Sequence, residues 1–148
     1  MVDHSALGRI GEPFEIEIER GKIREFARAT FSSSSSYLDD PAPVVPPTFL
    51  TTMILWSTPA SDPWEAVKMD QSRGLHAEQE YVFHGPPPRA GTRLTAQSRI
   101  DSIATKPGRR GGELTFVVLV TEFRDPFGRL VAEARMTGVE TSSLEGVS

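Results

Sequence analysis

Hydrophobic and polar residues alternate along most of the second half of the chain. Alternation with period two is typical of strands with one buried face. It predicts four strands, at residues 75–84, 92–106, 113–123 and 130–140, with turns rich in Gly and Pro between them. Five successive apolar residues, 116–120, predict that the third of these strands is buried on both faces.

The first half of the chain combines one short strand with two helical segments. The sequence FEIEIE at 14–19 alternates apolar and acidic residues, which favours a strand. KIREFARAT at 22–30 has its apolar residues at helical spacing and predicts a short amphipathic helix. PTFLTTMILWS at 47–57 has a proline suited to a first helical turn and is apolar almost all round, so we expect a core helix. The polar segment 58–74 is expected to be irregular.

Two stretches of biased composition separate the helical segments. Residues 32–36 are five consecutive serines, which composition alone would assign to a flexible linker. The stretch PAPVVPP at 41–47 enforces extended backbone, because each proline fixes its own φ and restricts the residue before it.

This order of elements predicts an α+β fold. A strand, a short helix, a buried helix and four antiparallel strands suit the hot-dog arrangement, an antiparallel sheet wrapped around one buried helix. The length of 148 residues fits a single domain, 1–148, in which segments 1–8 and 141–148 are expected to fray. A single hot-dog domain leaves one edge of its sheet and part of its apolar surface exposed, so we expect a dimer.

Composition removes several classes of function. The net charge is −4 and no basic stripe is apparent, which argues against nucleic acid as a partner. The chain has no cysteine, which excludes disulfides, thiolate metal ligands and a cysteine nucleophile. Three scattered histidines predict no metal site, and we expect no cofactor. No apolar segment approaches the length of a membrane span, so a cytoplasmic location is expected.

Several motifs occur in register along residues 9–140. They are IREFARAT (23–30), Tyr37 followed by Asp39, PPTF (46–49) and LHAEQ (75–79). Together they resemble the MaoC-like dehydratases of the FAS1-like N-terminal type, whose pattern is IREFAxAxGDxNPxYxD, PPTF and LHGEQ. The resemblance implies an (R)-specific enoyl-thioester hydratase, or the reverse 3-hydroxyacyl-thioester dehydratase, acting on acyl-CoA or acyl carrier protein.

The chain departs from this pattern where the family holds its catalytic pair. Catalytic members have an aspartate in G-D-x-N-P and a histidine five residues later. The two side chains bind one water molecule. Here Phe31 stands at the glycine position, Ser32 at the aspartate and Tyr37 at the histidine. A serine hydroxyl is a poor base near neutral pH and a tyrosine side chain ordinarily titrates near 10, so we expect the isolated chain to be inactive.

The resemblance therefore implies a non-catalytic, substrate-binding subunit. Related subunits of this kind pair with a second hot dog that carries the intact Asp/His pair, and they help to hold the acyl tail or pantetheine arm. Expected partners are a fatty-acyl or steroid-side-chain thioester and a catalytic MaoC-like subunit, or a second copy in a homodimer. Two alternatives are an acyl-thioester-binding module without turnover, and a hot-dog thioesterase with Asp39 or Glu78 as base.

The other candidate site residues each have a structural alternative. Pro47, Thr48 and Phe49 either line the thioester site through nearby amides or simply begin a helix. His76 and Glu78, two residues apart on a strand, could share a face as a proton relay. Alternatively, His76 and Gln79 anchor neighbouring backbone or the dimer seam.

Overall fold

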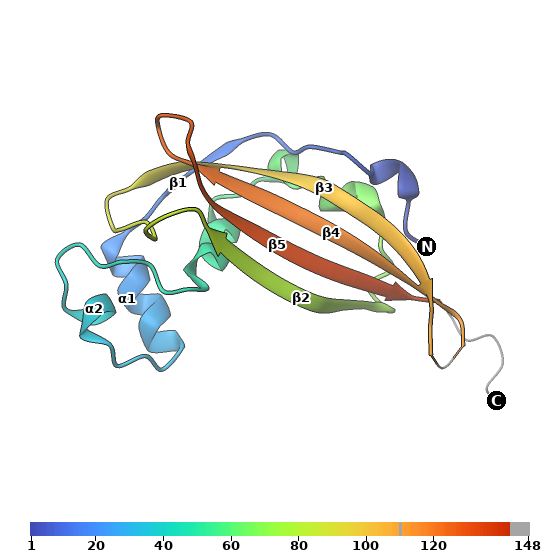
Figure 1. Cartoon of the computed structure of the whole chain (residues 1–148), viewed down its shortest axis with the longest axis horizontal. Coiled ribbons are helices and arrows are strands. Elements are labelled where there is room, and N and C mark those ends of the chain that lie inside the picture. The colour runs from blue at the N-terminus through green and yellow to red at the C-terminus, as the bar shows by residue number, and fades with distance from the viewer. Residues whose placement is uncertain (110, 143–148) are drawn as a thin grey trace.

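The computed structural model describes residues 1–109 and 111–142. Its centre is one five-stranded antiparallel sheet in the order β1-β3-β4-β5-β2, which curves over the helical segments (Figure 1). The α+β hot-dog prediction is confirmed, and each predicted strand is present within a few residues of its expected bounds. The strands are β1 (Phe14–Glu17), β2 (Gly74–Phe83), β3 (Arg93–Pro107), β4 (Glu113–Arg124) and β5 (Leu130–Thr141).

The two helices at one end of the sheet differ in how firmly they are held (Figure 1). The predicted amphipathic helix is α1 (Arg20–Ala29), which buries Ile23 and Ala27 against the sheet. The serine run, which composition alone would assign to a flexible linker, contributes to a single helical turn, α2 (Ser35–Leu38), which has no buried residue.

The predicted core helix at 47–57 is wrong in type and in burial. The segment forms a 3-10 helix, η2 (Phe49–Leu55), of which only Phe49 and Leu50 are buried. Ile54 and Leu55 are 72% and 62% exposed. Two further 3-10 helices follow in the segment expected to be irregular, η3 (Pro59–Ser61) and η4 (Pro63–Val67).

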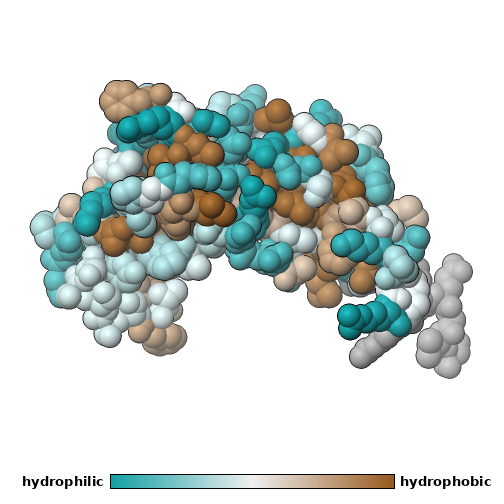
Figure 2. Space-filling view, viewed as in Figure 1, coloured by the Kyte–Doolittle hydropathy of each residue, from teal (hydrophilic) through white to brown (hydrophobic). Residues whose placement is uncertain are grey.

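Strand β4 is covered less completely than its apolar run predicts. Val117 and Val120 are fully buried, whereas Phe116, Val118 and Leu119 are only half-buried. Hydrophobic patches accordingly remain at the surface of the chain (Figure 2). Because Val117 and Val120 lie three residues apart on the strand, they point to opposite faces, so the run is partly covered on both faces.

The buried apolar residues form two clusters at opposite ends of the sheet. The first packs α1 and η2 against the ends of β3, β4 and β5, and includes Phe49, Leu94 and Phe123. The second joins the N-terminus and η4 to the other end of β3 and β4, and includes Val67 and Val117.

The N-terminus is packed, contrary to the prediction that residues 1–8 fray. Val2 and Ala6 belong to the second cluster, the Asp3 amide donates to the Val67 carbonyl at 2.8 Å, and residues His4–Ala6 form the 3-10 helix η1. At the other end Thr141 completes β5, and residues 143–148 of the predicted frayed tail lie outside the described residues. The side chains of Val2 and Ala6 therefore anchor the N-terminal segment that was predicted to fray.

Candidate functional site

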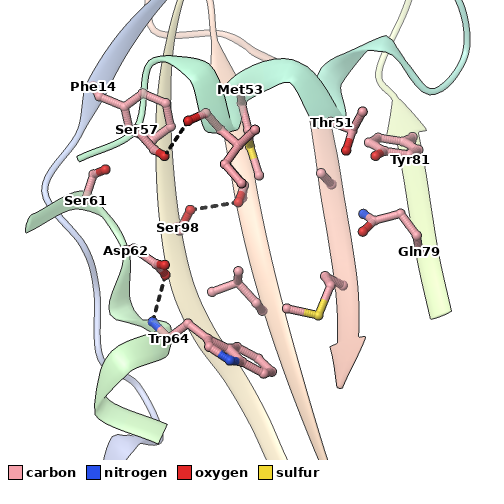
Figure 3. Close-up of a pocket in the computed structure, with 15 residues that line it drawn as sticks. Phe14, Thr51, Met53, Ser57, Ser61, Asp62, Trp64, Gln79, Tyr81 and Ser98 are labelled. Carbon is pink, nitrogen blue, oxygen red and sulfur yellow. Dashed lines mark hydrogen bonds between the residues drawn. The ribbon is translucent and has the colours of Figure 1, made fainter. Parts of the chain in front are cut away.

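A pocket of about 270 Å³ lies in the gap between the two hydrophobic clusters (Figure 3). Its floor is the inner face of β3, β4, β5 and β2, and its roof is formed by η2 and the segment that contains η3 and η4. The walls are mainly apolar, with few polar groups, as in sites for small organic ligands. The apolar lining is Phe14, Met53, Ile54, Trp64, Leu119, Ala134 and Met136.

Polar groups enter this pocket from three strands. Ser98 on β3 and Thr121 on β4 are opposite each other, and their buried hydroxyls share a hydrogen bond of 2.8 Å. Gln79 and Tyr81 point into the pocket from β2 (Figure 3). The Gln79 amide also donates to the Arg135 carbonyl at 3.2 Å, which fixes its side chain. The arrangement suits an apolar chain that carries one or two hydrogen-bonding groups.

The roof of the pocket is held in place by specific close contacts. The Asp62 carboxylate accepts a hydrogen bond of 2.9 Å from the Trp64 amide and begins η4. The Ser61 hydroxyl bonds both the amide and the carbonyl of Thr58, each at 2.8 Å. Gly11 lies directly below this turn and donates to the Ser98 carbonyl at 2.9 Å, which links roof to floor.

The loop that carries the degenerate catalytic positions lies apart from this pocket. Phe31 has φ of 57°, in the left-handed region that favours glycine, which agrees with its place at the glycine of the family pattern. The Ser32 amide donates to the Ala27 carbonyl at 2.8 Å and so ends α1. Tyr37 packs against the first cluster. Neither Ser32 nor Tyr37 lines the pocket, and residues 31–38 contain no carboxylate and no imidazole.

Pro47, Thr48 and Phe49 form the beginning of η2 and do not line the pocket. Pro47 and Thr48 are exposed, while Phe49 is buried in the first cluster and meets Phe26 edge-on. The Phe49 amide donates to the Pro46 carbonyl at 3.0 Å, so it is already used within the turn. These contacts favour the structural alternative for this segment, the start of a helix.

A β-bulge separates His76 from Glu78. The register pairs His76 with Gly138 and Glu78 with Thr137, which are neighbours on β5 and point to opposite faces. The proposed proton relay on one face is therefore wrong. The His76 ring instead lies 3.0 Å from the carbonyl oxygen of Glu78. Of the six residues predicted to bind substrate, only Gln79 lines the pocket.

The two carboxylates considered for a thioesterase do not line the pocket either. Glu78 and Asp39 are exposed. Asp40, next to Asp39, accepts from the Ala42 amide at 2.8 Å and lies 3.6 Å from Arg89, so it stabilises its own turn. This geometry supports a structural role for the pair of aspartates.

Sequence reasoning missed one titratable pair at the end of β2. The His84 ring lies 2.7 Å from the carboxylate of Glu133 on β5, which is buried. The hydrogen bond from His84, assisted by Arg135, holds the pKa of Glu133 below its usual range. The pairing of β2 with β5 brings the two groups together, because it places Val82 opposite Glu133 and His84 two residues further along; the strand pattern alone does not give this register.

The described part of the chain contains neither a metal-binding cluster nor a membrane-spanning helix. No group of three or more His, Asp or Glu side chains within residues 1–109 and 111–142 could hold a metal ion. Among the same residues, no helix is long and apolar enough to cross a membrane.

Comparisons with known proteins agree with this geometry. A model of the family described as "FAS1-like, dehydratase domain region" matches residues 5–134. A UPF0336 protein of Streptomyces coelicolor is 32% identical over 116 residues, which cover 72% of this chain and 77% of that protein.

Solved structures show the same fold. The C-terminally truncated HadBC complex of Mycobacterium tuberculosis, a 3R-hydroxyacyl-ACP dehydratase, is similar with a TM-score of 0.68 and 28% identity, over 90% of this chain and 96% of that one. The ChsH1–ChsH2 complex of the same organism is similar in fold, with a TM-score of 0.69 and 14% identity, over 97% and 93% of the two chains. The chain belongs to the FAS1-like dehydratase family, and its fold is that of the MaoC-like hot-dog proteins.

Proposed function

We propose that this chain is the non-catalytic, substrate-binding subunit of an (R)-specific enoyl-CoA or enoyl-ACP hydratase, which in reverse is a 3-hydroxyacyl-thioester dehydratase. The observation that carries the proposal is the loop at residues 31–38, which has no carboxylate or imidazole where the family holds its catalytic pair. Adding water across an enoyl thioester needs a base for the water and a proton donor for the α-carbon. Both groups would come from the partner subunit.

The role left to this chain is to bind the substrate. The pocket would take the apolar end of the acyl chain between Met53, Trp64 and Met136. The Ser98–Thr121 pair and the Gln79 amide would meet a polar substituent on that chain. Holding the chain in one place contributes to rate by orienting the reacting end toward the partner's catalytic groups.

The exposed edge of the sheet and the exposed apolar side chains support pairing with a second hot-dog domain. Strand β2 is an edge of the sheet, ten residues long and largely exposed, and an open edge of this length favours addition of another strand. Ile54, Leu55 and Leu75 are large apolar side chains that remain exposed in the single chain. HadBC and ChsH1–ChsH2 are both complexes by name, and the proposed partner is a hot-dog protein with an intact G-D-x-N-P-x-H loop.

The test is co-purification with such a partner, followed by an enoyl-thioester hydration assay. We expect no hydration by this chain alone and hydration by the pair, at a rate above that of the partner alone. Hydration of an enoyl thioester by the isolated chain would contradict the non-catalytic role. Ligand binding without turnover by any pair would favour the acyl-thioester-binding module, and release of free thiol would favour the thioesterase. The cytoplasmic location stays a prediction.

A further inference from the structure

Four residues of the pocket form one row across the inner face of the sheet. Tyr81 on β2 is opposite Ala134 on β5, and Ala134 is opposite Thr121 on β4. Thr121 is in turn opposite Ser98 on β3. Residues opposite each other in an antiparallel sheet point to the same face, and all four side chains line the pocket. The cross-sheet row is hereafter Tyr81, Ala134, Thr121 and Ser98.

The cross-sheet row leads from the edge of the sheet into the closed part of the pocket. Tyr81 is half-buried on the edge strand β2, beside the exposed Gln79. Ala134, Thr121 and Ser98 are 3%, 1% and 5% exposed. Neighbouring strands lie about 4.8 Å apart, so Thr121 is about 10 Å from the edge strand. A ligand that enters beside β2 therefore crosses two strand spacings before it meets a hydroxyl group.

The Ser98 and Thr121 hydroxyls have one proton more than their hydrogen bond uses. Each hydroxyl carries one proton, and its oxygen can also accept. One bond of 2.8 Å joins the two oxygens (Figure 3), so whichever oxygen donates, the proton of the other is left over. Within residues 1–109 and 111–142, no other hydrogen bond includes either hydroxyl oxygen. The floor of the pocket therefore has one unused donor.

The side chains next to the hydroxyl pair along its own strands cannot accept this proton. The neighbours on the same face are Ala96 and Ile100 on β3, and Leu119 and Phe123 on β4, all of them apolar. A buried donor without an acceptor is unfavourable, and unmatched donors are rarer in proteins than unmatched acceptors. The unused proton therefore points to an acceptor atom on the ligand.

We propose that this pocket selects acyl thioesters whose acyl group carries an oxygen acceptor in its interior, over acyl groups that are wholly hydrocarbon. The Ser98–Thr121 pair donates its unused proton to that ether, keto or hydroxyl oxygen, about 10 Å inside the edge of the sheet. The inference rests on the proposed function, whose substrate it narrows from any acyl thioester to an oxygenated one. An oxygen placed instead against Met53 or Met136 loses its water and gains no hydrogen bond.

The test is binding of a decanoyl-CoA series to the full chain, in which one methylene at a time is replaced by an ether oxygen. The ether oxygen accepts hydrogen bonds and hardly changes the shape of the acyl chain. Displacement of a fluorescent acyl probe measures the affinity. We expect one interior position at which the ether binds about fivefold tighter, or more, than at the other interior positions, because only there does it meet the unused donor.

The double variant S98A/T121V should remove this maximum, because it deletes both hydroxyls and nearly keeps the shape of the pocket floor. The matched control is S57A, which deletes a hydroxyl that lines the same pocket but already donates to the Ile54 carbonyl at 3.1 Å. The maximum should stay at the same position in S57A. A further control keeps the unmodified chain and replaces the ether oxygen by sulfur, a weak acceptor, which should give no maximum.

The outcomes separate this inference from the proposed function. A flat ether series means that solvent satisfies the proton, and it overturns the inference, as does a maximum that survives in S98A/T121V. If S98A/T121V does not melt cooperatively, the sulfur series decides, because an equal maximum with sulfur would show selection by shape alone. The expected maximum without hydration by any catalytic pair leaves the oxygen site standing and removes the proposed function. Hydration of enoyl-CoA by the pair, together with a flat ether series, does the reverse.

Discussion

The pocket and the serine-rich loop differ in how many fixed contacts hold them. The pocket lies between two hydrophobic clusters, with a buried hydroxyl pair in its floor and a roof held by hydrogen bonds at Ser61 and Asp62. The loop at 31–38 has no buried side chain, and it places an exposed phenylalanine in the left-handed region. In this fold the pocket can therefore be firmly held while the loop that carries the degenerate catalytic positions is not. Substitutions in the pocket should lower both the free energy of unfolding and the affinity for a ligand. Substitutions in the loop should lower neither.

The largest effect is expected at Gly11, which joins the floor of the pocket to its roof. A Cβ atom at this position would lie 2.1 Å from the Ser61 carbonyl oxygen, so Gly11→Ala must displace backbone. We expect the free energy of unfolding to fall by about 3 kcal/mol, measured by urea denaturation. Gly21→Ala is the control, because nothing lies within 4 Å of that position and it is in a helix. It should be neutral or stabilise by up to about 1 kcal/mol.

A substitution at Gly138 tests whether Trp64 shapes the wall of the pocket. A Cβ atom there would lie 2.7 Å from Cη2 of Trp64, so Gly138→Ala should push the indole into the pocket. We expect a loss of about 2 kcal/mol and weaker binding of a fluorescent acyl chain. In a Trp56→Phe background, Trp64 fluorescence reports the displacement. An unchanged spectrum and unchanged acyl binding would show that Trp64 does not shape the site.

The buried hydroxyl pair tests whether the floor depends on its hydrogen bond. Ser98→Ala leaves the Thr121 hydroxyl without that partner in a buried place, and should cost about 1.5 kcal/mol. Thr121→Val should cost a similar amount. The double variant should lose less than the sum, because neither polar group is then left alone. Strict additivity in thermal or urea unfolding would contradict the pairing.

The His84–Glu133 pair tests the end of β2, the strand that supplies Gln79 and Tyr81 to the pocket. The folded pKa of Glu133 is depressed, so its contribution to stability is present above pH 4.5 and is lost as the pH falls through the folded pKa. His84→Ala should cost up to about 1 kcal/mol at pH 7, discounted because the His84 side chain is 38% exposed, and less at pH 3. Unfolding at both pH values measures this, with His4→Ala as control. An equal loss at both would contradict the linkage.

The smallest effect is expected in the loop. Phe31→Gly removes left-handed strain of about 1–2 kcal/mol but adds about 0.5–1 kcal/mol of chain entropy to the unfolded state. The net result should be a gain of less than about 1 kcal/mol, read from the thermal midpoint, with acyl binding to the pocket unchanged. A clear loss of stability would mean that Phe31 packs within the chain and that the loop is more tightly built than the comparison implies.

The sequence predicted the strands well because alternation with period two reports burial directly. The prediction fails at 47–57, where apolar residues almost all round predict a core helix. Thr51 and Thr52 are β-branched and weaken an α-helix. The segment forms a 3-10 helix that leaves Ile54 and Leu55 largely exposed.

The site was harder to predict than the fold. Its lining comes from segments far apart in the sequence, such as Phe14, Tyr81 and Ser98, and Trp64 lies in a stretch expected to be irregular. The bulge that separates His76 from Glu78 has no local sequence mark.

The two edges of the sheet set a limit on assembly. Strand β2 offers ten residues, but its bulge confines regular pairing to the part after Glu78, and β1 at the opposite edge offers only four residues. Once two sheets have joined along β2, only the two short β1 edges are left. Open-ended growth needs two long complementary edges on every molecule, so an assembly built through β2 closes at a pair. A protein with one usable edge can expose it for a partner without risking fibres.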